Sequence, residues 1–217
     1  LDFAARAGLI NEQRLFSDEQ LAVIRNSCEF ALEDDATLSY AEEKQLHSVQ
    51  EQIELLLGNK TRIQRFANRY VAAKSVFFIG RGLDYTLSME GSLKLKEITY
   101  MHSEAYAAGE LKHGPISLIE DGTLVMASLT QEDLYKKTIS NIREVKSRGA
   151  FVLALTTTGH DDIEDTADYV LYIPQTNRYF TNSLAIIPFQ MFAYYVSIGK
   201  GLDVDKPRNL AKSVTVE

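Results

Sequence analysis

The chain contains an apolar run closed by glycines, Ser75-Val76-Phe77-Phe78-Ile79-Gly80-Arg81-Gly82. A short, continuous apolar run bounded by glycine is typical of a strand buried in a parallel sheet. Helical residues follow over residues 84–100. The run therefore predicts the first strand and the strand-to-helix turn of an α/β domain.

The alternation of strand and helix continues along the rest of the chain. We expect further strands at residues 124–129, 151–156 and 169–173, and helices at residues 132–148 and 181–199. Gly149 should close the first of these two helices, and Pro188 should kink the second. Helical crossovers between strands predict a doubly wound parallel sheet, so the expected fold is an α/β, three-layer α-β-α sandwich.

The first part of the chain is helical in character. A capping sequence at Ser17 predicts one helix start, and apolar residues at helical spacing predict helices at residues 40–57 and 61–72. We therefore expect a helical segment over residues 1–72 and an α/β domain over residues 73–217. The tail of that domain is too apolar for a random coil, so we expect it to dock.

The composition narrows the possible functions. The 217 residues include 23 basic and 30 acidic side chains, a net charge of −7, which argues against broad nucleic-acid binding. The single cysteine, Cys28, excludes an internal disulfide and a multi-cysteine metal site. No apolar run reaches the roughly 20 residues that span a bilayer, and no signal peptide is recognisable. We expect a cytoplasmic protein that binds neither nucleic acid nor a membrane.

The glycine turn after the first strand is the first place to look for a ligand, because parallel sheets bind ligands beyond the carboxyl ends of their strands. Its backbone N–H groups could face an anion. The dinucleotide-binding pattern G-x-G-x-x-G fails, however, since Tyr85 stands where the third glycine should be. A tight turn that needs glycine for its backbone geometry is the better interpretation.

The helix after this turn places three charged residues on one face. Glu90, Lys94 and Glu97 stand at positions i, i+4 and i+7. From spacing alone, an exposed salt-bridge ladder is the better interpretation. The functional alternative is a carboxylate base beside a cation that stabilises a developing oxyanion, as proton abstraction next to a carbonyl requires.

Other residues of the same helix are apolar or small. Met89, Leu93 and Ile98 are expected to pack against the rest of the domain. The small pair Gly91-Ser92 would let a ligand approach closely, and it could equally permit tight helix packing. The sequence leaves this choice open.

Two further residues could transfer protons or react near such a site. His113 precedes Gly114 and Pro115 in a constrained loop and could move protons near neutral pH, although a lone loop histidine is usually a surface residue. No metal-ligand spacing links it to the other histidines, so we expect no metal. Lys212, in the tail, attacks a carbonyl only if its pKa is lowered, and an exposed tail lysine is the default.

Three long segments together resemble a known family. They run over residues 89–100, 105–115 and 203–217, and the last reads Asp203-Val204-Asp205-Lys206-Pro207-Arg208-Asn209-Leu210-Ala211-Lys212-Ser213-Val214-Thr215-Val216-Glu217. They resemble the C-terminal sugar-isomerase (SIS) domain of the glucosamine-6-phosphate synthases, the isomerising glutamine–fructose-6-phosphate aminotransferases. The resemblance covers residues 48–217, with a looser likeness at residues 1–10.

The resemblance implies three catalytic roles. Glu97 matches the base that moves a proton between C1 and C2 of the sugar phosphate. Lys212 matches the lysine that forms a Schiff base with the C2 carbonyl of fructose 6-phosphate. His113 matches the histidine that assists ring opening, and in the family this histidine reaches into the neighbouring subunit's site. The resemblance therefore implies a homodimer.

It also implies roles for the surrounding residues. Glu90 and Lys94 match supporting positions of the substrate pocket, and Ala211 and Val214 match positions that line the route of ammonia. The tail would act as a lid that excludes water. The implied ligands are the sugar phosphates fructose 6-phosphate and glucosamine 6-phosphate, and no cofactor is expected.

The sequence also departs from the family pattern. The family's glutaminase domain begins with a catalytic cysteine, whereas Leu1 stands first here, so we expect no glutamine hydrolysis. We find no serine- and threonine-rich segment of the first SIS domain, so both of these domains are expected to be missing. Residues 1–10 resemble the last helix of that first SIS domain, and residues 11–46 match no part of the family.

Two function classes remain open. The first is an isomerase fragment that is incomplete without a phosphate-binding partner domain. The second is a non-catalytic module for sugar-phosphate binding or dimerisation, because SIS domains also occur in regulators. The presence of Glu97, His113 and Lys212 favours the first class, because a sensor has no use for a Schiff-base lysine. A separate sugar-phosphate isomerase is disfavoured by the carboxyl-terminal match.

Overall fold

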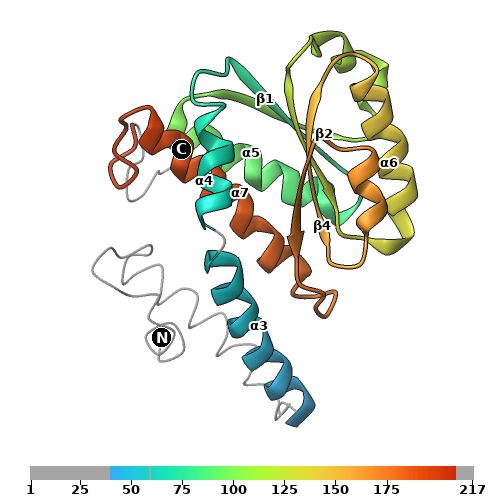
Figure 1. Cartoon of the computed structure of the whole chain (residues 1–217), viewed down its shortest axis with the longest axis vertical. Coiled ribbons are helices and arrows are strands. Elements are labelled where there is room, and N and C mark those ends of the chain that lie inside the picture. Colours follow the sequence, from blue (N-terminus) through green and yellow to red (C-terminus); the bar gives the residue numbers. More distant parts are fainter. Residues whose placement is uncertain (1–39, 59, 209–217) are drawn as a thin grey trace, which may run out of the picture. The chain divides into compact units, whose positions relative to one another are not determined.

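The computed structural model describes residues 40–58 and 60–208, with side chains from residue 48 onward (Figure 1). The chain divides into two compact units, Leu1–Glu54 and Leu55–Glu217. Helix α3 (Tyr40–Gly58) confirms the helix predicted over residues 40–57. The helix predicted to start at Ser17 lies outside the described residues, as do Cys28 and residues 1–10.

The second unit is built around a five-stranded, wholly parallel sheet. The strand order is β2-β1-β3-β4-β5, which confirms the predicted doubly wound fold. The strands are β1 (Ser75–Gly80), β2 (His102–Ala107), β3 (Leu124–Leu129), β4 (Phe151–Thr157) and β5 (Tyr169–Ile173).

Strand β2 was not predicted from the sequence. This strand reads His-Ser-Glu-Ala-Tyr-Ala and lies at one edge of the sheet, so only Ser103 among its residues is fully buried. An edge strand needs neither a continuous apolar run nor a clean alternation of apolar and polar residues, and these were the two signals available.

The predicted helices are present with small changes of boundary. They are α4 (Lys60–Asn68), α5 (Leu83–Thr99), α6 (Glu132–Lys146) and α7 (Thr181–Gly199), which continues through Pro188. The prediction that the first of these helices reaches residue 72 is wrong. It ends in tight turns, with Arg69 N–H donating to Phe66 O and Tyr70 N–H to Ala67 O, because the chain must reverse before β1.

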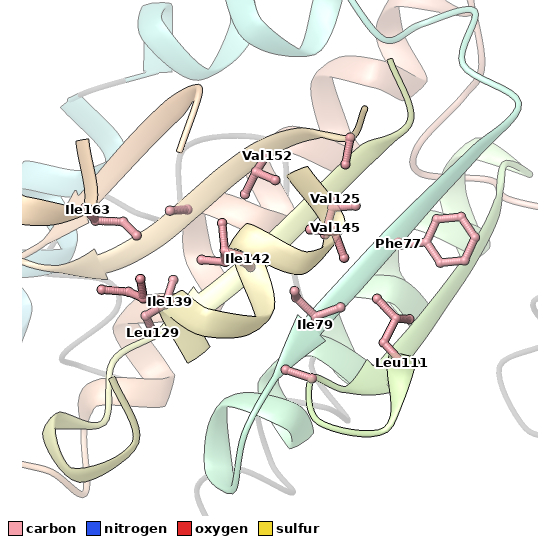
Figure 2. Packing of buried hydrophobic residues seen from close by; sticks show 14 of the residues in the cluster. Phe77, Ile79, Leu111, Val125, Leu129, Ile139, Ile142, Val145, Val152 and Ile163 are labelled. Carbon is pink, nitrogen blue, oxygen red and sulfur yellow. The ribbon is translucent and has the colours of Figure 1, made fainter. Parts of the chain in front are cut away.

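Alternate residues of the strands point to opposite faces of the sheet, which produces the three layers. One face packs against α6, and Figure 2 shows Ile139, Ile142 and Val145 of that helix over the sheet residues Val125 and Val152. All five of these side chains are 6% exposed or less. Among the described residues, no helix is long and apolar enough to span a membrane.

The opposite face packs against α5 and α7, and the contact depends on Gly91. A Cβ at this position would lie 2.7 Å from Cδ2 of Phe189 and 3.1 Å from Cε1 of Phe78. The two phenyl rings meet edge to face at 5.3 Å. Glycine therefore lets α5 approach both β1 and α7, which decides between the two interpretations of Gly91-Ser92 in favour of tight packing.

The same contact predicts a loss of stability. Gly91→Val should lower the free energy of unfolding by about 1–3 kcal/mol, because both rings are buried and cannot move aside. Gly58→Val is the control, because no atom lies within 4 Å of its built Cβ. Urea unfolding measures both variants, and equal stability of Gly91→Val and the parent chain would contradict this account of the packing.

Candidate active site

Helix α5 runs from the carboxyl edge of the sheet back to its amino edge, because it joins the end of β1 to the start of the parallel strand β2. Glu90 lies near the middle of this helix, and Lys94 and Glu97 lie in its second half. Glu97 is 14 positions after Leu83, about 21 Å along the helix axis at 1.5 Å per residue. The charged cluster is therefore displaced from the glycine turn, where the sequence analysis first looked for a ligand.

The charged residues do form one cluster. Lys94 Nζ lies 2.8 Å from Glu97 Oε2 and 3.6 Å from Glu90 Oε1. The side chains of Glu90, Lys94 and Glu97 are 45%, 34% and 26% exposed, so the cluster is neither fully solvated nor buried. Burial acts to lower the pKa of Lys94, but the hydrogen bond and charge of Glu97 and the charge of Glu90 outweigh it, so the pKa is raised. Lys94 is thus a fixed cation between two carboxylates.

Apolar side chains surround this cluster at the surface. Met89 and Leu93 are 49% and 42% exposed, so the prediction that they pack in the domain is wrong. The buried face of α5 instead contains smaller residues, including Ser92, whose hydroxyl lies 2.8 Å from that of Ser103 in β2. Two exposed apolar side chains therefore lie on the same helix as the ion cluster.

At the carboxyl edge of the sheet, the turn after β1 and the residues after β3 are joined by hydrogen bonds. Asp84 is 1% exposed and accepts bonds from the N–H of Thr130 at 2.8 Å and from its hydroxyl at 2.5 Å. Gln131 Nε2 donates to the carbonyl of Arg81 at 2.6 Å. A Cβ on Gly80 would meet the carbonyl oxygen of Asp84 at 2.3 Å, which confirms that the glycine turn is set by backbone geometry.

His113 lies on the loop after β2, in the short 3-10 helix Leu111–His113. Its side chain is 65% exposed, and its Nε2 is 3.9 Å from Glu110 Oε2. The loop passes close to Arg81, since a Cβ on Gly109 would meet Nη2 of Arg81 at 2.7 Å. Because β2 is parallel to β1, its carboxyl end lies beside Gly80, so this loop belongs to the carboxyl edge of the sheet.

The described part of the tail docks on the other edge, at the end of α5. Tyr100, which follows α5, has a left-handed backbone (φ 57°, ψ 20°). Its hydroxyl accepts a hydrogen bond from the N–H of Arg208 at 2.7 Å, and the guanidinium of Arg208 lies 4.4 Å from the centre of its ring. The end of α7 adds two bonds, from Ser197 Oγ to Ile98 O at 2.8 Å and from Lys200 Nζ to Thr99 O at 3.2 Å.

Three of the predicted site residues, Ala211, Lys212 and Val214, lie outside the described residues. Within the described part of the chain, no group of three or more histidine, cysteine, aspartate or glutamate side chains is arranged to hold a metal ion. The sequence analysis missed Tyr100 and Arg208 as partners. Nothing in their spacing could have paired them, because 108 positions separate them in the chain.

Sheet order and helix arrangement define a doubly wound α/β domain whose candidate site lies at the far end of the first crossover helix. A family model described as the SIS domain matches residues 70–199, which is more than half of the chain. The chain belongs to the SIS domain family.

Comparison with individual proteins shows which members of this family the chain is similar to. The chain is 55% identical over 173 residues to a glutamine–fructose-6-phosphate aminotransferase (isomerizing) of Caldanaerobacter subterraneus subsp. tengcongensis, covering 80% of this chain and 28% of that protein. It is 51% identical over 174 residues to the protein of that name in Clostridium tetani, covering 80% and 29%. The chain thus spans less than a third of the length of these relatives.

A solved structure agrees in fold. The C-terminal domain of glucosamine-fructose-6-phosphate aminotransferase from Francisella tularensis superposes with a TM-score of 0.69 at 31% identity. The match covers 78% of this chain and 49% of that one.

The partial exposure of the ion cluster predicts that it adds little to stability. Lys94→Gln should lower the free energy of unfolding by less than about 1 kcal/mol, since partly exposed ion pairs contribute no more than that. Lys96→Gln, an exposed lysine on the same helix, is the control. A loss of several kcal/mol by urea unfolding for Lys94→Gln alone would show that the cluster is structural.

Proposed function

We propose that this chain is the second sugar-isomerase domain of an enzyme that converts fructose 6-phosphate and ammonia to glucosamine 6-phosphate. Lys212 attacks the C2 carbonyl of the open-chain sugar, and water leaves as the imine forms. Ammonia then displaces Lys212 from C2. Glu97 removes a proton from C1 and returns it to C2, while the O1 proton moves to the nitrogen, giving the amino aldose. The names of the relatives support this reaction.

The docking of Arg208 on Tyr100 is the observation that carries the proposal. Tyr100 follows Glu97 by three positions, about 5 Å along the helix axis. Lys212 follows Arg208 by four positions, which span at most about 14 Å of extended chain. The tail is thus delivered to the end of α5 that carries Glu97, within reach of Lys212.

Lys94 completes the chemistry as an electrostatic partner. Its raised pKa keeps it charged at neutral pH, 2.8 Å from the proposed base. A fixed cation beside the carboxylate can stabilise the negative charge that develops when the C1 proton is removed. The same cation cannot serve as the imine-forming amine, since that role needs an unprotonated nitrogen.

The separation of His113 from Glu97 supports a homodimer. Within one protomer these residues lie at opposite edges of the sheet, because α5 runs the full way between the edges. One protomer therefore does not supply both to one substrate. A second copy of the chain would bring its His113 to the site at the end of α5, and the exposed Met89 and Leu93 indicate a surface that is covered in the assembly.

Reductive trapping tests the imine. The chain is incubated with fructose 6-phosphate and borohydride, and peptides are analysed by mass spectrometry. We expect a hexose phosphate adduct on Lys212 and none on Lys206, the tail lysine six positions before it. Tyr100→Ala, which removes the docking ring, should reduce the adduct. Saturable sugar-phosphate binding without any adduct would favour the non-catalytic sensor.

Exchange of the C1 proton with solvent tests the proposed role of Glu97 as the base. Glu97→Gln should leave the adduct on Lys212 but slow the exchange of the C1 proton with deuterated solvent by about 10²–10⁴-fold, the usual contribution of a general base. Nuclear magnetic resonance of the sugar follows this exchange. Unchanged exchange in Glu97→Gln would assign the base to another residue.

Sedimentation checks the assembly. At micromolar concentration the chain should sediment as a dimer, because the site needs His113 from a second copy. A monomer at this concentration, together with intact adduct formation, would contradict the shared site.

A further inference from the structure

Helix α4 presents an arginine cluster that the proposed reaction does not use. Arg62 and Arg65 lie in the helix, Arg69 directly follows it, and all three residues are exposed. Together with four other residues they line a hollow of about 470 Å³, which lies within the range of small-molecule sites. The other lining residues are Gly58, Thr61, Phe66 and Tyr169.

No carboxylate neutralises this cluster in the part of the chain that the structure describes. None of the three arginines takes part in an ion pair there, although the whole chain is acidic, with a net charge of −7. Asp168 directly precedes the lining residue Tyr169 in the sequence, but this carboxylate already has other partners. It pairs with Lys146 and accepts a hydrogen bond from the N–H of Val152 at 2.7 Å.

Two of the guanidinium groups are held in place by the protein. Arg62 donates to the carbonyl of Val170 at 2.8 Å and to the hydroxyl of Tyr169 at 3.1 Å, and it lies 5.1 Å from the centre of that ring. Arg69 lies 5.0 Å from the ring centre of Phe151. A guanidinium has five N–H donors, so both keep free donors for a ligand.

The simplest alternative explanation for the arginines is that they cover the neighbouring aromatic rings, Tyr169 and Phe151. Long cationic side chains often lie over exposed rings, and Arg62 and Arg69 do so here. Arg65 does not fit this explanation, because it is exposed and has no ring or hydrogen-bond partner among the described residues. The three positive charges around one small hollow also repel one another, and contacts between arginines and aromatic rings do not remove this repulsion.

We propose that this hollow binds a compact anion containing linked phosphate groups. Arginine forks match phosphate oxygens and pair with them bidentately. Arg62 and Arg69 are seven positions apart with Arg65 between them, and three guanidinium groups spread over more than one helical turn suit two linked phosphates better than one. Tyr169 offers no free face to a nucleobase, because Phe66 stacks on it at 4.5 Å and Arg62 lies over it.

Calorimetry with pyrophosphate tests this site in the whole chain. We expect saturable binding that weakens as salt is raised, because the contacts are ionic. Arg65→Gln should weaken binding about tenfold, the loss expected for one charge-assisted hydrogen-bonded contact. Arg148→Gln removes the same charge from an exposed position outside the hollow and should change the affinity by less than about twofold. Both variants should unfold at the temperature of the parent chain.

Three results would overturn the proposal. The first is the absence of saturable heat with pyrophosphate at low salt. The second is an equal loss in Arg65→Gln and Arg148→Gln, which would show a diffuse charge effect. The third is equally tight binding of citrate, which would show that carboxylates serve as well as phosphates. None of these results depends on the reaction proposed for Glu97 and Lys212.

Discussion

The direction of α5 is the constraint on which the candidate site depends. A crossover between parallel strands must return from the carboxyl edge of the sheet to the amino edge, and Gly91 lets this helix lie directly on β1 and α7. Residues early in the helix therefore face the glycine turn, and residues late in it face the opposite edge. Glu97 lies late, and in the described part of the tail Arg208 contacts Tyr100, the residue directly after the helix.

This direction explains why the site is assembled from distant parts of the chain. The end of α5 is held by Ser197 and Lys200 of α7, and Tyr100 receives the tail through Arg208. The loop of His113, in contrast, begins at the other edge, where the N–H of Ala108 donates to the carbonyl of Gly80 at 2.8 Å. This geometry is the reason we propose that a second copy of the chain supplies His113 to the site.

Much of the fold could be predicted from the sequence, because buried parallel strands are apolar without interruption. The strands around Phe77, Met126 and Leu153 were found in this way, whereas β2 was missed because an edge strand need not be apolar. Helical spacing placed Glu90, Lys94 and Glu97 together correctly. It could not show that Met89 and Leu93 are exposed, since burial depends on what covers the helix and not on its own pattern.

The remaining parts of the site depend on tertiary contacts that no local pattern encodes. Tyr100 and Arg208 are brought together only by the path of α7. Arg62, Arg65 and Arg69 were not singled out from the sequence, because the hollow that they line is visible only in the folded domain. Resemblance assigned roles to Glu97 and Lys212, and the docking of Arg208 on Tyr100 supports our proposal that the two residues meet.

Zero-length cross-linking tests the central claim most directly. A mixture of unlabelled and ¹⁵N-labelled chains is treated with a carbodiimide, which joins a lysine to a carboxylate only when they are in contact. The account predicts an isopeptide bond between Lys212 and Glu97 in which both residues come from the same chain. Cross-links of Lys212 only to carboxylates at the carboxyl edge of the sheet, such as Glu110, would contradict it.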